Sequence, residues 1–256
     1  MKLMEEAHIE VDSRKIEIVS QRHEGRLPAV LEIDDVLATL LGIWVAEGSF
    51  TKYSVRITTK DKNIEKIVRK FCKKYGLNMT RNKGQIIISS YPQKVLIKTL
   101  GFKSGAENKN IPSIVFAWPR RSVEAFLRGY LSGDGSVYKN QKGVLTLEAS
   151  THSKELANDL MYIFLFFGIV AKKYERFEKN RKKCYRICFS GVENFKKFMS
   201  IGFLQQDKNI KIKNYVESRK WIRSQQIPID DYLRELIKPK LKEWKNSRTI
   251  GKRKLK

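Results

Sequence analysis

Two nine-residue stretches of the sequence are nearly alike. Residues 40–48 read LLGIWVAEG, and residues 127–135 read LRGYLSGDG. In both, small residues hold the third and seventh places, an acid holds the eighth and glycine the ninth; the acids Glu47 and Asp134 are 87 positions apart. Small residues four apart leave one helical face almost bare of side chains. The stretches therefore predict two helices whose backbones pack closely together across a pseudo-twofold axis.

The similarity continues downstream of both stretches. An alternating segment follows each one, at 54–59 and 144–151, and indicates a strand. Next comes a helical segment with Asp61 or Ser153 as its expected N-cap and Gly76 or Gly168 at its end. A hairpin and a short helix complete each half, at 78–90 and 171–190 for the hairpins and before Gly101 and Gly202 for the helices. The order helix, hairpin, helix, hairpin, helix occurs twice, which indicates a tandem duplication.

The composition favours a polyanionic partner. The 256 residues include 52 Lys+Arg against 27 Asp+Glu, a net charge of +25, and such an excess suits phosphate neutralisation. A hydrophobic content of 41% suffices for a core. The longest apolar run, near residues 161–170, is about ten residues long and too short to span a bilayer. Without a signal peptide or a CxxC pair, we expect an intracellular protein with no membrane partner.

The placement of the two acids points to a metal site. A carboxylate in the last turn of a helix faces unpaired carbonyl groups, which costs about 0.3–1 kcal/mol. Close packing of the helices would also bring Glu47 and Asp134 together. A hard cation such as Mg²⁺ would reverse the sign of both effects, with the carbonyl groups of Ala46 and Gly133 as further oxygen ligands. The alternative, two ordinary solvated helix ends, is disfavoured because the pattern occurs twice.

These residues resemble the LAGLIDADG homing endonucleases, in the single-chain class with two motifs. The resemblance covers residues 34–215. It implies an α+β fold of two αββαββα subdomains related by pseudo-twofold symmetry, whose antiparallel sheets form a saddle on DNA. It also implies a monomer that hydrolyses both strands of a long double-stranded DNA target with about two or three Mg²⁺ ions, which Mn²⁺ or Ca²⁺ can replace in binding. An RNA maturase acting on intron RNA, or a catalytically silent DNA-binding protein on this fold, is the alternative.

The repeat and the charge also divide the chain. We expect an N-terminal segment at 1–33, the two subdomains at 34–118 and 119–215, and a basic helical extension at 216–256. The last 50 residues hold sixteen Lys+Arg and six Asp+Glu, and a helix is expected near 230–244. Since no His-Asn pair with a following nucleophile ends the sequence, self-splicing is not expected. An intron-encoded protein, a free-standing gene and an excised intein domain all remain open.

The family also uses a basic residue near each metal site, commonly a lysine after the second hairpin's helix. Lys109, in AENKNIPSI, occupies that place in the first half, and KNIP resembles the lysine block of intein-encoded members. Lys208, in LQQDKNIKI, occupies it in the second half, with Lys211 as a competitor. Either lysine could instead be a phosphate contact or a solvated loop residue.

Strand alternation predicts which side chains face DNA. In residues 54–59, Val55 and Ile57 would face the core, whereas Arg56 and Thr58 would face outward. Trp44 and Tyr130, inside the motif helices, are expected in the core. The side chains expected to contact DNA are basic or hydroxylic and lie on strands or in adjoining loops: Lys52, Arg56, Thr58, Arg81, Lys83, Lys172, Arg176, Lys182 and Arg186.

Overall fold

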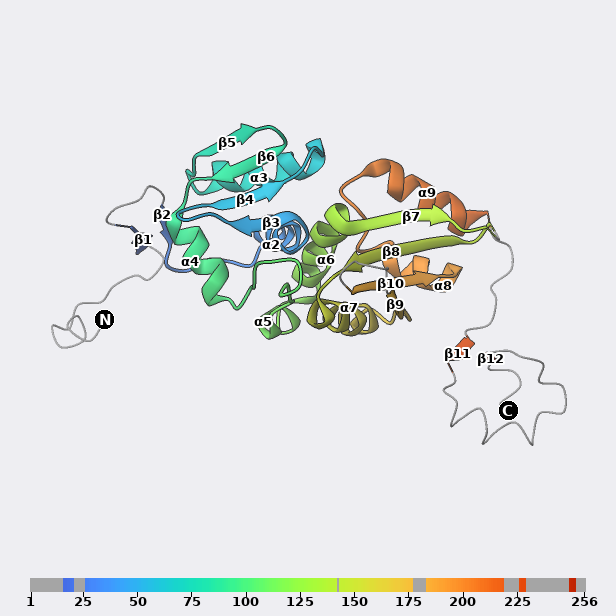
Figure 1. The fold of residues 1–256 in the computed structure, drawn as a ribbon. Coiled ribbons are helices and arrows are strands. Elements are labelled where there is room, and N and C mark those ends of the chain that lie inside the picture. The colour runs from blue at the N-terminus through green and yellow to red at the C-terminus, as the bar shows by residue number, and fades with distance from the viewer. Residues whose placement is uncertain are drawn as a thin grey trace.

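The computed structural model describes residues 16–20, 26–141, 143–176, 183–218, 226–228 and 249–251. Two halves with the same order of elements lie side by side (Figure 1). The first half contains α2 (Asp35–Glu47), β3 (Gly48–Phe50), β4 (Val55–Thr58), α3 (Lys62–Lys74), β5 (Met79–Asn82), β6 (Gln85–Ile88) and α4 (Tyr91–Thr99). The second contains α6 (Arg120–Asp134), β7 (Gly135–Lys139), β8 (Leu145–Thr151), α7 (Lys154–Phe166), β9 (Lys172–Arg176), β10 (Cys184–Ser190) and α8 (Val192–Phe198). The predicted duplication is confirmed.

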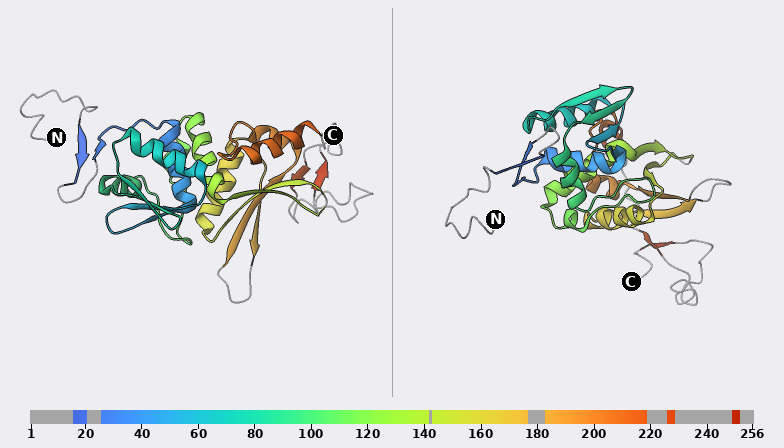
Figure 2. Two further views of the ribbon diagram at one scale, coloured as in Figure 1. Left: turned by 90° about the horizontal axis from the view of Figure 1, so that it is seen from above. Right: turned by 60° about the vertical axis from the view of Figure 1, so that its left-hand side comes forward.

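Each half has one four-stranded antiparallel sheet. The strand orders are β3-β4-β6-β5 and β7-β8-β10-β9. Gly48 pairs with Ile57 in the first sheet and Gly135 with Ala149 in the second, so both sheets begin directly after a motif acid in the same register. Figure 2 shows the helices gathered on one side of the molecule and the strands curving along the other. The α+β fold with paired antiparallel sheets is therefore as the resemblance implied.

The motif helices α2 and α6 pack along their glycine faces. A β-carbon added at Gly42 would lie 1.9 Å from the carbonyl oxygen of Phe126, and one added at Gly129 would lie 2.1 Å from that of Thr39. Real side chains cannot approach so closely, so glycine is required on steric grounds. Trp44 and Tyr130 lie in the core, as predicted, with 1% and 0% of their surfaces exposed.

Local sequence explains where most elements begin and end. Asp34, Asp61 and Ser153 cap α2, α3 and α7 through their side-chain oxygens. Gly76 and Gly168, which follow α3 and α7, adopt φ values of +60° and +69°, which favour glycine. Helix α6 begins at Arg120, after Pro119, without a side-chain cap. Ser122 Oγ in its first turn donates to the Ile33 carbonyl oxygen at 2.8 Å.

Several elements lie outside the duplicated pattern. These are the paired strands β1 (Glu17–Val19) and β2 (Arg26–Pro28), the short helix α5 (Ser113–Phe116), helix α9 (Gln206–Glu217) and the paired strands β11 (Gln226–Pro228) and β12 (Thr249–Gly251). The helix expected at 230–244 lies outside the described residues, so the extension at 216–256 and the other domain boundaries remain proposals. In the described part of the chain, no helix is long and apolar enough to cross a membrane.

Candidate metal centre and nucleic-acid interface

The two motif acids lie next to each other at the ends of the paired helices. Glu47 is the last residue of α2 and Asp134 the last of α6. A β-carbon added at Gly133, beside Asp134, would lie 3.1 Å from Glu47 Cγ. Burial raises the pKa of Asp134 to about 7; Lys109 opposes the rise, and the charge of Glu47 adds to it. Burial also raises the pKa of Glu47.

Lys109 lies close enough to interact electrostatically with both acids. Its Nζ donates a hydrogen bond to the carbonyl oxygen of Ala46, the residue before Glu47. Burial lowers the pKa of the Lys109 ammonium, while the charges of Asp134 and Glu47 hold it up. The structure thus brings three of the predicted site residues together around one point.

Lys208 lies differently. It sits in the first turn of α9 rather than in a loop, because α9 begins at Gln206. Its Nζ donates to the Gly135 carbonyl oxygen at 2.8 Å, and burial lowers its pKa against the charges of Asp207 and Asp61. Lys211 Nζ reaches only the Val137 carbonyl oxygen, at 3.1 Å, further along β7. Lys208 is therefore the better match to Lys109, although Asp134 is not among its charged neighbours.

The oxygen atoms at this point suit a hard divalent cation. Burial raises the pKa of both carboxyl groups, and the charge of Glu47 adds to the rise at Asp134. A positive ion between the two groups would favour their ionised forms. The described residues contain no cluster of three or more His, Cys, Asp or Glu side chains, so the remaining ligands would be carbonyl oxygens and water. Mg²⁺ tolerates such a set because it keeps several waters. Glu47 and Asp134, with the carbonyl groups of Ala46 and Gly133, would hold the ion.

The half-buried acid Asp134 makes the stability of the metal-free protein depend on pH. The pKa of Asp134 is higher in the folded state than the ordinary 3.8, so the folded state holds this proton more tightly and loses stability as pH rises from about 4 to about 7. Asp134→Asn should therefore stabilise the metal-free protein at pH 8 by on the order of 2 kcal/mol and change little at pH 4. Urea unfolding in EDTA at both pH values measures this difference; an equal effect at the two would contradict it.

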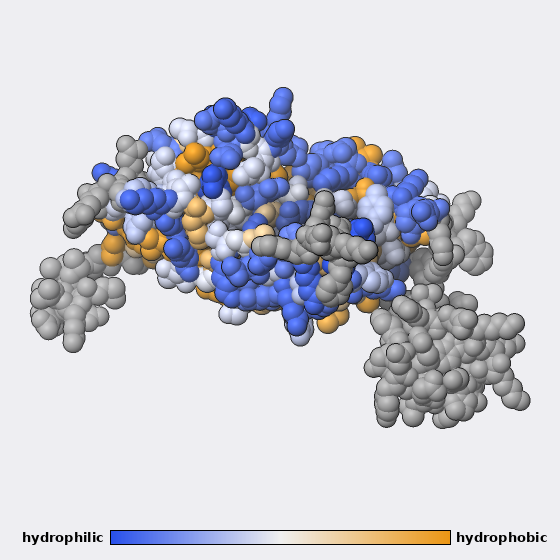
Figure 3. Space-filling model, viewed as in Figure 1, coloured by the Kyte–Doolittle hydropathy of each residue, from blue (hydrophilic) through white to orange (hydrophobic). Residues whose placement is uncertain are grey.

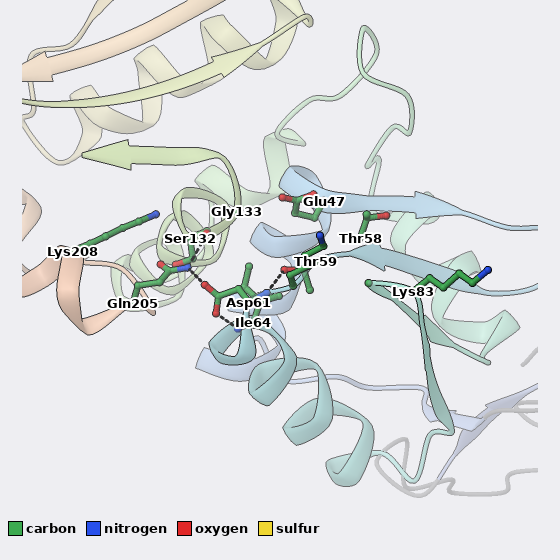
Figure 4. A pocket seen from close by; sticks show the side chains of 12 residues that line it. Glu47, Thr58, Thr59, Asp61, Ile64, Lys83, Ser132, Gly133, Gln205 and Lys208 are labelled. Atoms are coloured by element: carbon green, nitrogen blue, oxygen red, sulfur yellow. Dashed lines mark hydrogen bonds between the residues drawn. The ribbon is translucent and has the colours of Figure 1, made fainter. Parts of the chain in front are cut away.

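An open pocket of about 400 Å³ lies beside Glu47, between the two halves (Figure 4). Its walls come from the end of β4, the turn after β5, the end of α6 and the start of α9. Lys60, Lys83 and Lys208 all line it, which makes it suitable for an anion such as a DNA phosphate.

The open face of the first sheet carries two of the predicted DNA contacts. Arg56 and Thr58 point away from the core, and Arg56 Nε donates to Ser49 Oγ at 3.1 Å. Lys52 and Lys83 are exposed in the adjoining turns. The structure does not support Arg81 as a contact, because it lies opposite Ile86 on the helix-covered face and forms an ion pair with Glu65 of α3.

The open face of the second sheet carries three more. Lys172, Arg176 and Arg186 share this face through the β9–β10 pairing. Glu148 of β8 holds Arg186 by a bond from Nε at 2.7 Å and a second from its guanidinium. The Tyr138 hydroxyl also donates to Glu148, at 2.8 Å. Lys182 lies outside the described residues.

Sequence reasoning missed a pair of structural residues beside the lysines. Asn110 Oδ1 accepts a hydrogen bond from the Lys103 amide at 3.0 Å, and Asn209 Oδ1 accepts one from the Phe203 amide at 2.8 Å. Each asparagine thereby holds the segment that carries its neighbouring lysine. The sequence contained a sign of this pair, because Lys-Asn-Ile occurs in both halves.

The face of the molecule seen in Figure 3 is mostly hydrophilic, as the high content of charged residues predicts.

Comparison with protein families gives one match, in two parts. The model described as a LAGLIDADG-like domain matches residues 34–99 and 122–201, which together make up more than half of the chain. The chain belongs to the LAGLIDADG-like domain family. The two matched ranges contain the acids Glu47 and Asp134, one in each LAGLIDADG-like repeat.

Curated relatives of this LAGLIDADG-like chain are much longer proteins. The replication factor C small subunit of Methanocaldococcus jannaschii is 30% identical over 226 residues, which are 82% of this chain and 12% of that protein. A DNA polymerase of Thermococcus kodakarensis is 32% identical over 159 residues, 58% of this chain and 9% of that protein. The chain therefore corresponds to a small part of each relative.

Two solved structures have a similar fold. The homing endonuclease I-DmoI in complex with DNA and Ca matches at a TM-score of 0.50 and 14% identity, covering 72% of this chain and 100% of that one. Full-length DUF199/WhiA from Thermatoga maritima matches at a TM-score of 0.51 and 16% identity, covering 82% and 67%. At such identities the likeness shows the two-motif LAGLIDADG fold alone.

Proposed function

We propose that this protein is a divalent-metal-dependent endonuclease that hydrolyses both strands of a long double-stranded DNA site. The observation that carries the proposal is the pair of half-buried carboxylates, Glu47 and Asp134, at the ends of two tightly packed helices with Lys109 beside them. Folding alone does not favour such a pair, since burial disfavours the ionisation of both acids and the charge of Glu47 further disfavours that of Asp134. A cation bound by both carboxylates would stabilise their ionised forms and could bind a DNA phosphate.

Different residues of the chain would bind DNA, hold the metal and orient water. The open sheet faces would lie in the major groove, where Arg56 and Arg186 can donate to guanine and Lys172 can contact phosphate. Glu47 and Asp134 would hold the metal, and Lys109 Nζ would orient water at the scissile phosphate. The metal, when bound, would stabilise charge on the phosphate and assist ionisation of the attacking water. The pocket lysines Lys60 and Lys83 would secure the adjoining backbone.

We further propose that the nuclease belongs to an insertion in a larger protein, of the intein type. The DNA polymerase and replication factor C relatives support this, because the matched region is only 9% or 12% of each. A nuclease of this kind would act on the coding locus that lacks the insertion. The homing endonuclease I-DmoI, whose structure was solved in complex with DNA and Ca, supports the reaction class and the use of a divalent metal.

The direct test uses a supercoiled plasmid that carries the protein's own coding locus joined without the insertion. We expect a linear product in Mg²⁺ and none in EDTA. A plasmid that binds the protein but stays supercoiled would contradict the nuclease assignment and indicate a silent DNA-binding protein. Stimulated splicing of a cognate intron RNA without plasmid cleavage would instead indicate a maturase.

The two lysines should contribute unequally. Lys109 interacts with both acids, whereas the charged neighbours of Lys208 are Asp207 and Asp61. Lys109→Met should therefore lower the rate of linear-product formation on the order of a hundredfold, and Lys208→Met on the order of tenfold. Single-turnover cleavage at saturating protein measures both rates. Equal losses would show that the electrostatic asymmetry has no effect on the reaction.

A further inference from the structure

We propose that the helix after the first hairpin of each half positions the lysine of the opposite half. The side chains responsible are the caps of these helices, Asp61 of α3 and Ser153 of α7. Each reaches across the molecule to a lysine segment, defined as residues 204–209 around Lys208 or residues 103–111 around Lys109. The inference rests on the proposed function, because it assigns the two lysines to cleavage.

The two caps are built alike. Asp61 Oδ1 accepts from the Asn63 amide at 2.6 Å, and the Asp61 amide donates to Thr59 Oγ1 at 3.1 Å. Ser153 Oγ accepts from the Leu156 amide at 3.1 Å, and the Ser153 amide donates to Thr151 Oγ1 at 3.1 Å. Each cap thus lies directly after β4 or β8, and its position is tied to the end of that strand.

Asp61 crosses to the second half through its other oxygen. Oδ2 accepts a hydrogen bond from Gln205 Nε2 at 2.6 Å (Figure 4). The same nitrogen donates to the Ser132 carbonyl oxygen at 2.9 Å, close to the end of α6. Gln205 is buried, and it precedes Lys208 by three residues. The first half therefore holds the start of the helix from which Lys208 reaches Gly135.

Ser153 crosses to the first half in the same sense. Its Oγ donates to the carbonyl oxygen of Lys109 itself, at 2.6 Å, and the serine is fully buried. Two more side chains of α7 contact the same segment. Asp159 Oδ2 accepts from the Ile111 amide at 2.9 Å, and Glu155 pairs with Lys103 at 2.7 Å. The Lys109 segment is thus held by the second half at three points.

This arrangement joins DNA recognition in one half to the lysine of the other. The strands β4 and β8 place Arg56 or Glu148 on the open sheet faces and run within a few residues into Asp61 or Ser153. The end of a DNA-facing strand in one half is therefore connected, through a short stretch of chain and a hydrogen bond, to the lysine segment of the other half. Asp61 and Ser153 are positioning residues, because their side chains act through the lysine segments.

Three substitutions separate positioning from helix capping. Asp61→Asn keeps a capping oxygen for α3 but offers Gln205 an amide in place of the accepting Oδ2. Ser153→Ala removes the bond to Lys109, and Ser153→Thr restores the hydroxyl. Ser90→Ala is the matched control: Ser90 is also fully buried and caps α4 by accepting from the Gln93 amide at 3.2 Å, outside both lysine segments.

The readout is the nicking rate of each strand in a duplex that the wild type cleaves, with the two strands labelled separately. Asp61→Asn should slow one strand on the order of tenfold and Ser153→Ala the opposite strand, with DNA affinity unchanged. Ser90→Ala should slow neither strand selectively, and Ser153→Thr should recover the wild-type rate. If both variants slow the same strand, or both strands equally, the crossed assignment is wrong.

A second measurement does not need cleavage. By hydrogen–deuterium exchange, Asp61→Asn should speed exchange in residues 204–209 and Ser153→Ala in residues 103–111, each across the molecule from the substitution. Unchanged exchange in those segments would overturn the inference even if the wild type cuts DNA. A wild type that cuts no DNA while the exchange pattern is as expected would refute the proposed function and leave the crossed contacts as structure only.

Discussion

Glu47→Gln and Asp134→Asn should each remove double-strand cleavage while DNA binding is retained. The loss should be on the order of a thousandfold or more, because each change deletes a charged ligand of the shared metal site. Affinity should hold or rise slightly, since the DNA-facing residues are untouched and one negative charge near the phosphates is removed. Plasmid cleavage in Mg²⁺ and a filter-binding titration without metal measure the two quantities.

The matched control is Glu193→Gln, which removes an exposed carboxylate of α8 paired with Lys196. It should leave cleavage and binding as in the wild type. Cleavage that persists in the double variant of Glu47 and Asp134 would mean that the reaction takes place elsewhere on the protein.

Gly42→Ala should destabilise the protein by about 3 kcal/mol or more. The added β-carbon would lie 1.9 Å from the Phe126 carbonyl oxygen and 2.8 Å from the Tyr130 amide nitrogen, both backbone atoms of α6. The two helices would have to separate, and the acids at their ends would separate with them. Urea unfolding monitored by circular dichroism gives the change in the free energy of unfolding.

Gly76→Ala is the comparison for that substitution. Gly76 has a φ of +60°, but no described atom beyond the glycine and its chain neighbours lies within 4 Å of an added β-carbon. Its cost should therefore be the conformational strain alone, about 1 kcal/mol. Equal costs at the two positions would show that backbone contact between the motif helices does not limit the fold.

The duplicated motif made most of the fold predictable. Small residues at a helical spacing predict a helix pair, and the alternation in residues 54–59 and 144–151 predicts two strands, both of which the structure contains. The faces predicted for residues 55–58 are also as the structure has them. The pair Glu47 and Asp134 followed from the same repeat. The approach of Lys109 to both acids depends on α2 and α6 and was predicted by family resemblance rather than by physical reasoning.

Arg81 shows an error that the sequence itself could have prevented. The two-residue turn at Lys83 and Gly84 places Asn82 opposite Gln85, and therefore Arg81 opposite Ile86 on the covered face. Arg81 was predicted to face DNA because of its charge, without regard to the strand register that places its side chain on the helix-covered face.

The hydrogen bonds between the two halves could not be predicted from the sequence. Asp61 and Gln205 are 144 positions apart, and their bond depends on how the two subdomains dock. The sequence also did not predict that Lys208 lies in a helix. The duplicated pattern ends before α9, so it gives no expectation of a helix at residues 206–217.

The central claim is that Glu47 and Asp134 together form one divalent-metal site. Mn²⁺ titration of the protein–target complex, followed by electron paramagnetic resonance of the free ion, tests it most directly. The wild type should bind Mn²⁺ that the double variant Glu47→Gln, Asp134→Asn does not bind, at equal DNA occupancy. The same number of bound ions in the two proteins would contradict the claim.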